Sequence, residues 1–229
     1  MTLLSRRLFA ILALCLLPAF AQPAPLVPAP FERLVPTAFD DGLRLVELQA
    51  RALDAPPWRM LEWQAVPDSP PRRDKVSVRE GVRAMYAYPG SDSFANVKVE
   101  TSMPGMYEQD RTLVRAALEH NYRHKRARMD ARLAADPALR AGVAARTAPG
   151  REVTAFESAT VNGIEVVSYT EHGLGNGGII GMIHFFVPGR ETIVTAYLLN
   201  GKRNRFKDIE DFLRLRAAFI QGYTAFLAR

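Results

Sequence analysis

The chain has 229 residues, of which 48% are hydrophobic and 24% charged, with a formal net charge of +6 at pH 7. This length is enough for one substantial domain. The charge is only mildly basic, which does not indicate a nucleic-acid-binding protein.

The first residues, MTLLSRRLFAILALCLLPAFA, have the three parts of a bacterial secretory signal peptide. Arg6 and Arg7 form the positive region, Leu8–Leu17 form the apolar run, and Ala19–Ala21 is a small-x-small cleavage site. The apolar run is shorter than the roughly 20 residues that a membrane span needs. We therefore expect cleavage after Ala21, a periplasmic protein and no membrane span. SRRLF also resembles a twin-arginine signal, so the export route stays open.

Cleavage would leave 208 residues with a formal charge of +4. It would also remove Cys15, the only cysteine of the chain. Disulfides, thiol catalysis, cysteine-ligated zinc and iron–sulfur clusters are then excluded, so the stability of the domain must come from burial.

The segment Gln22–Pro36 carries five prolines and predicts an extended tether, so we expect a single domain over residues 37–229. Residues 37–53 fit two structures. Thr37 could cap a helix whose apolar stripe begins at Phe39, whereas the alternation in GLRLVELQA fits a strand.

Three strand-like runs follow, Trp58–Val66, Val76–Tyr88 and Phe94–Thr101, and turn sequences separate them. From Tyr107 to about Ala135 the apolar residues recur at helical spacing.

Two hairpins are predicted next. Asn162-Gly163 separates two strand-like runs and is the strongest two-residue hairpin signal, and Pro188–Arg190 separates two more. A final helix is expected from about Asp208 to Leu227, with its buried face formed by Ile209, Phe212, Leu213, Phe219 and Phe226.

The run Ile179–Val187 is apolar on both faces apart from His184. A strand with one solvent-exposed face would alternate between apolar and polar residues. We therefore expect a central strand that helices cover on both sides, one of them the C-terminal helix. The predicted fold class is α+β, an antiparallel sheet flanked by helices in an α/β/α sandwich.

GLGNGG, residues 173–178, fits the spelling of a dinucleotide-binding motif. That motif needs a strand before its glycines and a helix after them. Here strands lie on both sides, which predicts a flexible hairpin loop, and we expect no cofactor. Loops on a rigid scaffold often carry recognition. Four positions of this loop are therefore candidate binding residues: Gly173, Gly175, Asn176 and Gly178.

The order of these elements resembles the PsbP/Mog1-like superfamily over roughly residues 58–226. The resemblance rests on ANVKVETSMPG, a long helix, VNGIEVVSYTEH, a strand, ETIVTAYLLNGKRNRF and a closing helix with RAAFI. The family is mostly non-catalytic and includes photosystem accessory subunits, a nuclear-transport factor and bacterial envelope and secretion-associated proteins. The resemblance implies a binding role and supplies no catalytic residues.

His120 and His124 lie four apart on the long helix, a spacing that can present two imidazoles to a metal. The sequence between them supplies no third ligand, so we expect no metal site. Three neighbouring basic residues, Arg123, Lys125 and Arg126, could contact an anionic partner. No aromatic residues interleave with them for base stacking.

Glu171, His172 and His184 are the best candidates for an enzyme. An acid–base pair needs hydrogen-bond reach, and several residues of strand separate His172 from His184. His184 also fits a core histidine.

The sequence favours a periplasmic, non-catalytic binding or accessory protein whose partner is another envelope protein, with a secretion-system or toxin-immunity role among the options. The alternatives are a hydrolase-like periplasmic enzyme and a metal-binding protein.

Overall fold

The structure, a computed structural model, describes residues 26–50, 78–144, 156–172, 179–199 and 209–229. The expected signal peptide, the strand-like run Trp58–Val66 and the loop GLGNGG lie outside the described residues.

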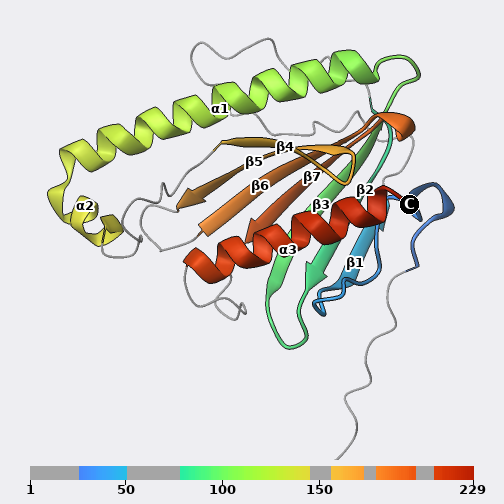
Figure 1. Cartoon of the computed structure of the whole chain (residues 1–229), viewed down its shortest axis with the longest axis horizontal. Coiled ribbons are helices and arrows are strands. Elements are labelled where there is room, and N and C mark those ends of the chain that lie inside the picture. The colour runs from blue at the N-terminus through green and yellow to red at the C-terminus, as the bar shows by residue number, and fades with distance from the viewer. Residues whose placement is uncertain (1–25, 51–77, 145–155, 173–178, 200–208) are drawn as a thin grey trace, which may run out of the picture.

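A seven-stranded antiparallel sheet with the strand order β1-β2-β3-β7-β6-β5-β4 forms the centre of the molecule (Figure 1). The strands are β1 (Arg44–Ala50), β2 (Val78–Ala87), β3 (Ser93–Ser102), β4 (Glu157–Val161), β5 (Ile164–His172), β6 (Ile179–Val187) and β7 (Thr192–Leu199). The helices are α1 (Tyr107–Ala135), α2 (Pro137–Ala144) and α3 (Ile209–Leu227). The expected α+β class is therefore confirmed.

Both predicted hairpins form. Asn162 and Gly163 have φ angles of 50° and 78°, as a two-residue turn with both central residues at positive φ requires. Val161 pairs with Ile164 on either side of this turn. The second hairpin joins β6 to β7 through the short 3-10 turn Pro188–Arg190.

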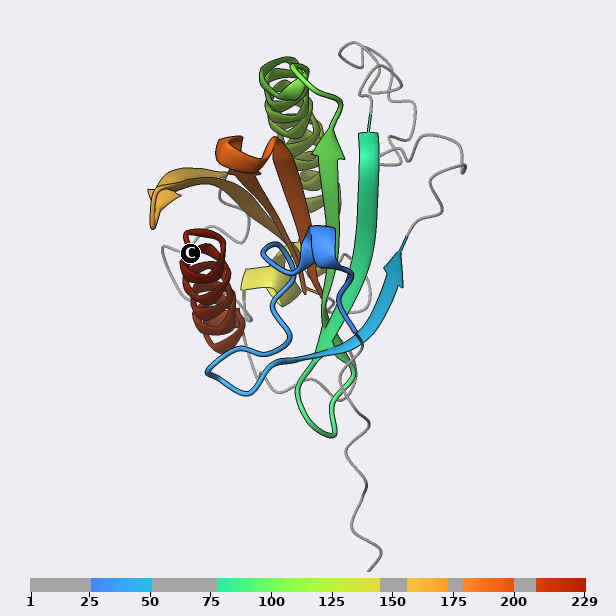
Figure 2. The ribbon, with the colours of Figure 1, turned by 90° about the vertical axis from the view of Figure 1, so that its right-hand side faces the viewer.

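β6 is an inner strand, and apolar side chains pack against both of its faces. Phe185 stacks on Tyr223 of α3, with ring centroids 5.0 Å apart. On the other face Met182 and Phe186 join Val114 and Leu118 of α1. The two helices therefore lie on different sides of the strands (Figure 2).

The start of the domain matches one of its two expected structures, the strand, and differs from the expected tether. Residues 44–50 form a strand and not a helix, because Leu43 and Leu45 point into the core. Part of the expected proline-rich tether also packs into this core: Val27, Phe31, Leu34 and Val35 are buried. The hydroxyl of Tyr223 donates a hydrogen bond to the Leu34 carbonyl over 2.6 Å, which holds this segment against α3.

The buried face of α3 also differs in part from the expected one. Phe212 and Phe219 are buried as expected, whereas Phe226 is only half-buried. Leu215, Tyr223 and Leu227 complete the buried face. The observed face follows the helical repeat from Phe212 more closely than the expected one did.

The part of α1 up to Tyr122 packs on the sheet. Its buried residues are Tyr107, Asp110, Val114, Ala117 and Leu118. Beyond Leu118, the side chains that the structure describes are half-buried or exposed, and the helix continues past the strands toward α2 (Figure 1).

Candidate functional site

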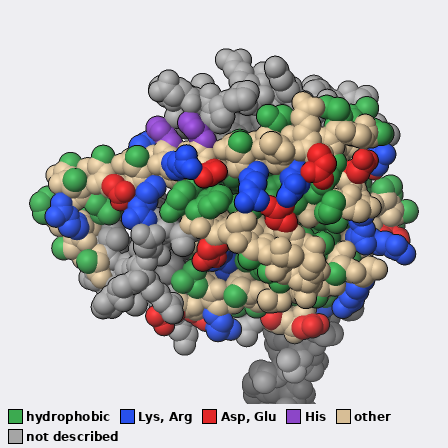
Figure 3. Space-filling model, turned by 45° about the horizontal axis from the view of Figure 1, so that its top comes forward, with side chains coloured by type: hydrophobic (Ala, Val, Ile, Leu, Met, Phe, Trp, Pro, Cys, Tyr) green, Lys and Arg blue, Asp and Glu red, His purple; other side chains and the backbone are tan. Residues whose placement is uncertain are grey.

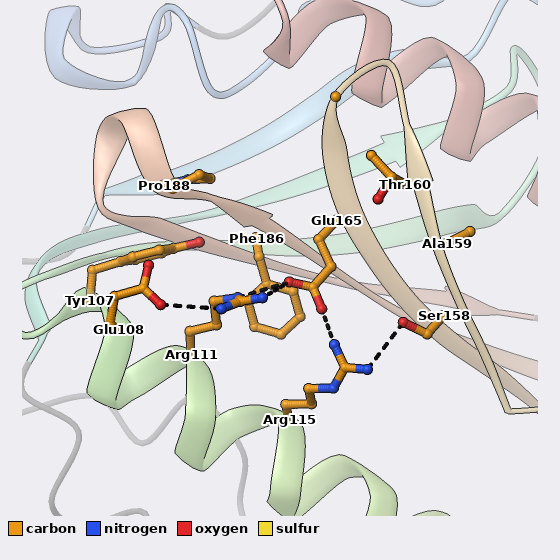
Figure 4. Close-up of a pocket in the computed structure, with 11 residues that line it drawn as sticks. Tyr107, Glu108, Arg111, Arg115, Ser158, Ala159, Thr160, Glu165, Phe186 and Pro188 are labelled. Atoms are coloured by element: carbon orange, nitrogen blue, oxygen red, sulfur yellow. Dashed lines mark hydrogen bonds and ion pairs between the residues drawn. The ribbon is translucent and has the colours of Figure 1, made fainter.

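A hollow of about 630 Å³ lies between the N-terminal half of α1 and the β4–β5 hairpin (Figure 4). We call it the α1–hairpin pocket. Its walls carry Tyr107, Glu108, Arg111 and Arg115 from α1, Ser158, Ala159, Thr160, Gly163 and Glu165 from the hairpin, and Phe186 and Pro188 from the end of β6.

Local structure explains why these side chains meet. Arg111 and Arg115 lie one helical turn apart, so both point from the same side of α1. Glu165 is the second residue of β5 and pairs with Phe186, whose side chain packs in the cluster beneath α1. Paired residues share a face of the sheet, so the Glu165 side chain also projects toward α1.

The two arginines share the Glu165 carboxylate. Arg111 donates from Nε and Nη2 to Oε2 at 2.8 and 2.5 Å, and Arg115 donates from Nη1 to Oε1. The hydrogen bonds to Glu165 raise the pKa of Arg111 above its ordinary value, so this guanidinium stays charged. Arg111 also donates to Glu108 at 3.1 Å, and Arg115 reaches Ser158 at 3.4 Å.

These contacts leave part of the donor capacity unused. Each guanidinium has five N–H donors. Arg111 makes three hydrogen bonds and Arg115 makes two to the residues that the structure describes. The two side chains are 36% and 44% exposed, so their remaining donors can reach a ligand in the pocket.

Tyr107 adds an uncharged polar group to one wall. The residue is buried, and its hydroxyl has no hydrogen-bond partner among the described residues. Burial raises the pKa of this phenol well above its ordinary value, so it remains neutral.

The pocket suits recognition of an oxyanion better than catalysis. Two guanidiniums face one carboxylate in its interior, and Glu108, which offsets the remaining charge, is 70% exposed. The described residues of the lining include no histidine or cysteine. Its one enclosed carboxylate, on Glu165, already accepts hydrogen bonds from two arginines on both of its oxygens, which makes it a poor general base.

The basic residues predicted to bind an anion lie farther along α1. Arg123 pairs with Glu119, and Arg126 pairs with Asp130 at 3.2 Å. Both pairs are one turn long and lie within the helix, so much of this charge is compensated locally. The space-filling view shows basic and acidic side chains next to each other along α1 (Figure 3). The Lys125 side chain and the loop residues Gly173, Gly175, Asn176 and Gly178 lie outside the described residues.

The structure does not bring the enzyme candidates together. His184 is buried on the α1 face and pairs with Val167 of β5. His172 lies five residues farther along β5, a separation of roughly 16 Å along a strand. Glu171 lies next to His172 at the C-terminal end of β5, and the side chains of these two residues lie outside the described part of the structure.

The two histidines of α1 lie one helical turn apart, as their spacing predicts. His120 and His124 are both half-buried on the helix. Among the described residues, no group of three or more histidine, cysteine, aspartate or glutamate side chains could hold a metal ion.

Sequence reasoning missed the α1–hairpin pocket. Its signals were present but separate: two arginines at helical spacing on α1, and Glu165 between the apolar residues Ile164 and Val166 at the start of a strand. No local pattern relates Arg111 to a residue 54 positions later in the chain.

Comparison with protein-family models, curated proteins and solved structures finds no match for this chain. None of the described helices is both long and apolar enough to cross a membrane.

Proposed function

We propose that this protein is an exported, periplasmic binding or accessory protein without catalytic activity, and that its α1–hairpin pocket receives an acidic group of a protein partner. One observation carries the proposal: Arg111 and Arg115 retain N–H donors that the described residues do not use, and both line an open hollow of about 630 Å³. A carboxylate matches a guanidinium in both charge and geometry, and it is the matching group that a protein side chain supplies.

We further propose that the fold is an α/β/α sandwich of the PsbP/Mog1-like type. The packing of α1 and α3 on different faces of one antiparallel sheet supports it, as does the order of the elements along the chain. The mostly non-catalytic character of that superfamily agrees with the chemistry of the pocket.

The partner belongs to the cell envelope in this proposal, because the N-terminal residues have the pattern of a secretory signal peptide. A component of a secretion system or a toxin that this protein neutralises would both be met in that compartment. Mass spectrometry of protein from the periplasmic fraction should find Gln22 or a close neighbour at the N-terminus. Retention of Met1 in the membrane fraction would contradict export.

A photo-crosslinking amino acid at Thr160, on the rim of the pocket, tests the binding role in cells that express the full chain. We expect one defined crosslinked product that disappears when Arg115→Gln is added. Arg126→Gln is the matched control, because Arg126 lies on the same helix away from the pocket and pairs within the helix. Crosslinking that is equally strong in all three backgrounds would contradict the proposal.

A further inference from the structure

We propose that the partner docks as an added β-strand on the outer edge of β4 and places an acidic side chain in the α1–hairpin pocket. This inference rests on the proposed function and specifies its partner: an extended peptide segment that carries a carboxylate. Strand addition supplies affinity through main-chain hydrogen bonds, and pockets beside the edge select the side chains.

The two edges of the sheet are built differently. The chain folds back over one end of β1, where Ala38 bridges to Arg44 and the Leu45 amide donates to the Thr37 carbonyl at 3.0 Å. A β-bulge between Leu45 and Glu47 also interrupts this strand. Chain cover and bulges are the usual devices that keep an edge strand from pairing with another chain.

Among the described residues, β4 has neither device. It is the last strand of the sheet, with no described strand on its outer side, and its first four residues are exposed. Its register with β5 is regular from Glu157 to Val161.

The hairpin geometry determines which backbone groups of β4 point outward. The pair Val161–Ile164 closes a two-residue hairpin, and such a closing pair exchanges its backbone hydrogen bonds. Pairs alternate along an antiparallel ladder, so the N–H and C=O groups of Ser158 and Thr160 point away from β5. These are the groups that an added strand would engage.

The same two residues lie beside the arginines. The side chains of Ser158 and Thr160 project to the α1 face and line the pocket, and Arg115 already reaches Ser158. An added strand would lie ~4.8 Å beyond β4, and every second side chain would project to this face. An acidic residue at one of those positions would meet the unused donors of Arg115.

Contacts on both faces hold β4 in place before any partner binds. On the α3 face, Arg216 pairs with Glu157 at 2.7 Å, and Asn162 donates to Thr224 at 3.0 Å. On the α1 face, Arg115 contacts Ser158. An edge that is already ordered loses little further conformational entropy on binding, which favours docking there.

A second copy of this chain is a weaker candidate for the occupant. If β4 of one copy paired with β4 of another, the side chains on the α1 face would be Ser158 and Thr160 of each copy. Neither carries a carboxylate, so the arginines would stay without an anionic partner. The charge of the pocket therefore favours a different protein.

The test uses two short synthetic peptides with capped ends, both of alternating valine and threonine. One carries a single central glutamate and the other a glutamine at that position. We expect the glutamate peptide to bind the mature protein roughly tenfold more tightly in fluorescence anisotropy, as one charge-assisted contact allows. Arg115→Gln should remove this preference, whereas Arg126→Gln should preserve it.

Two measurements test the strand itself. Thr160→Pro removes one outward N–H and should reduce the binding of both peptides at least tenfold while the melting temperature shows a folded protein. Hydrogen exchange on the unmodified protein gives the same information without a mutation. The amides of Ser158 and Thr160 should exchange more slowly when the glutamate peptide is present.

The possible failures are distinguishable. Binding that depends on Arg115 but leaves the β4 amides unprotected would overturn strand addition and leave the proposed pocket intact. Protection of these amides without a preference for glutamate would overturn the role of the pocket. A dimer in sedimentation experiments that Thr160→Pro dissociates would assign the edge to a second copy and overturn the inference.

Discussion

The two faces of the sheet are built on different principles. On the α3 face, aromatic rings from β1's flanking segment, the strands and α3 form one continuous core: Phe39 contacts Tyr86, Phe219 and Tyr223, and Phe185 stacks on Tyr223. On the α1 face, a smaller apolar cluster lies under the first turns of α1 and borders charged groups.

The difference concerns stability on one face and the proposed recognition on the other. The α3 face buries large apolar surfaces, which is the main source of folding free energy. The α1 face keeps two arginines half-exposed in an open pocket, which adds little to stability but suits an interaction with a ligand. Mutations on the two faces should therefore affect different measurements.

The largest expected effect is on the α3 face. Phe185→Ala should lower the free energy of unfolding by about 3–5 kcal/mol, because the ring is fully buried between Phe219 and Tyr223. Leu118→Ala, in the smaller cluster under α1, should cost about 2–3 kcal/mol. Urea denaturation of both variants measures the difference. The comparison of the faces fails if Leu118→Ala costs more than Phe185→Ala.

The next largest loss of stability is expected at Gly181, where β6 and α3 approach each other closely. A Cβ added to Gly181 would lie 3.1 Å from the Phe212 ring of α3 and 3.4 Å from the Leu198 Cβ. Gly181→Ala should therefore cost about 1–3 kcal/mol through overpacking. Gly189→Ala is the matched control, since a Cβ there meets nothing within 4 Å. Equal melting temperatures for the two variants would show that α3 sits more loosely than the structure has it.

Much of this fold could be predicted from local patterns. The Asn162-Gly163 turn, the bounds of α1 and the double-sided apolar pattern of β6 all follow from residues adjacent in sequence. Turn chemistry and hydrophobic periodicity are local properties, so one sequence is enough to show them.

The start of the domain could not be predicted in the same way. The bulge between Leu45 and Glu47 interrupts the alternation of apolar and polar residues that a strand would show. The sequence pattern therefore fitted a helix as well as a strand. The prolines of this segment predicted an extended tether, but Val27, Phe31 and Leu34 are buried, and the Leu34 carbonyl accepts a hydrogen bond from Tyr223 of α3. The pocket was missed for a related reason, because its contacts join residues far apart in the chain.

Alkaline pH should lower the free energy of unfolding, most clearly through two buried tyrosines on the α3 face. Burial raises the pKa of Tyr86 and Tyr223 above the ordinary value of 10.0. The unfolded chain therefore loses these protons above pH 10 while the folded protein keeps them. The contribution of these two tyrosines to the free energy of unfolding is therefore fully present below pH 10. Above pH 10 it declines by about 1.4 kcal/mol per pH unit for each tyrosine.

Denaturation of Tyr223→Phe between pH 9 and about 11.5 tests this expectation. The variant should lose about 1 kcal/mol at neutral pH, because the hydrogen bond to the Leu34 carbonyl is gone. Its stability should then fall less steeply above pH 10 than that of the unmodified protein. Identical slopes would mean that Tyr223 ionises as readily in the folded state as in the unfolded chain.

The smallest expected change in stability belongs to the residue with the largest expected effect on binding. Arg115→Gln should alter the free energy of unfolding by about 1 kcal/mol or less, because the Arg115 side chain is 44% exposed. Glu165 would keep its two hydrogen bonds from Arg111, so no carboxylate is left buried without a cation. The same substitution should remove the glutamate preference of the peptide assay. A loss of more than about 2 kcal/mol in urea denaturation, with peptide preference unchanged, would instead make the Arg115–Glu165 pair a structural link between α1 and the hairpin. The α1 face would then serve stability as the α3 face does, and the separation of roles between the two faces would fail.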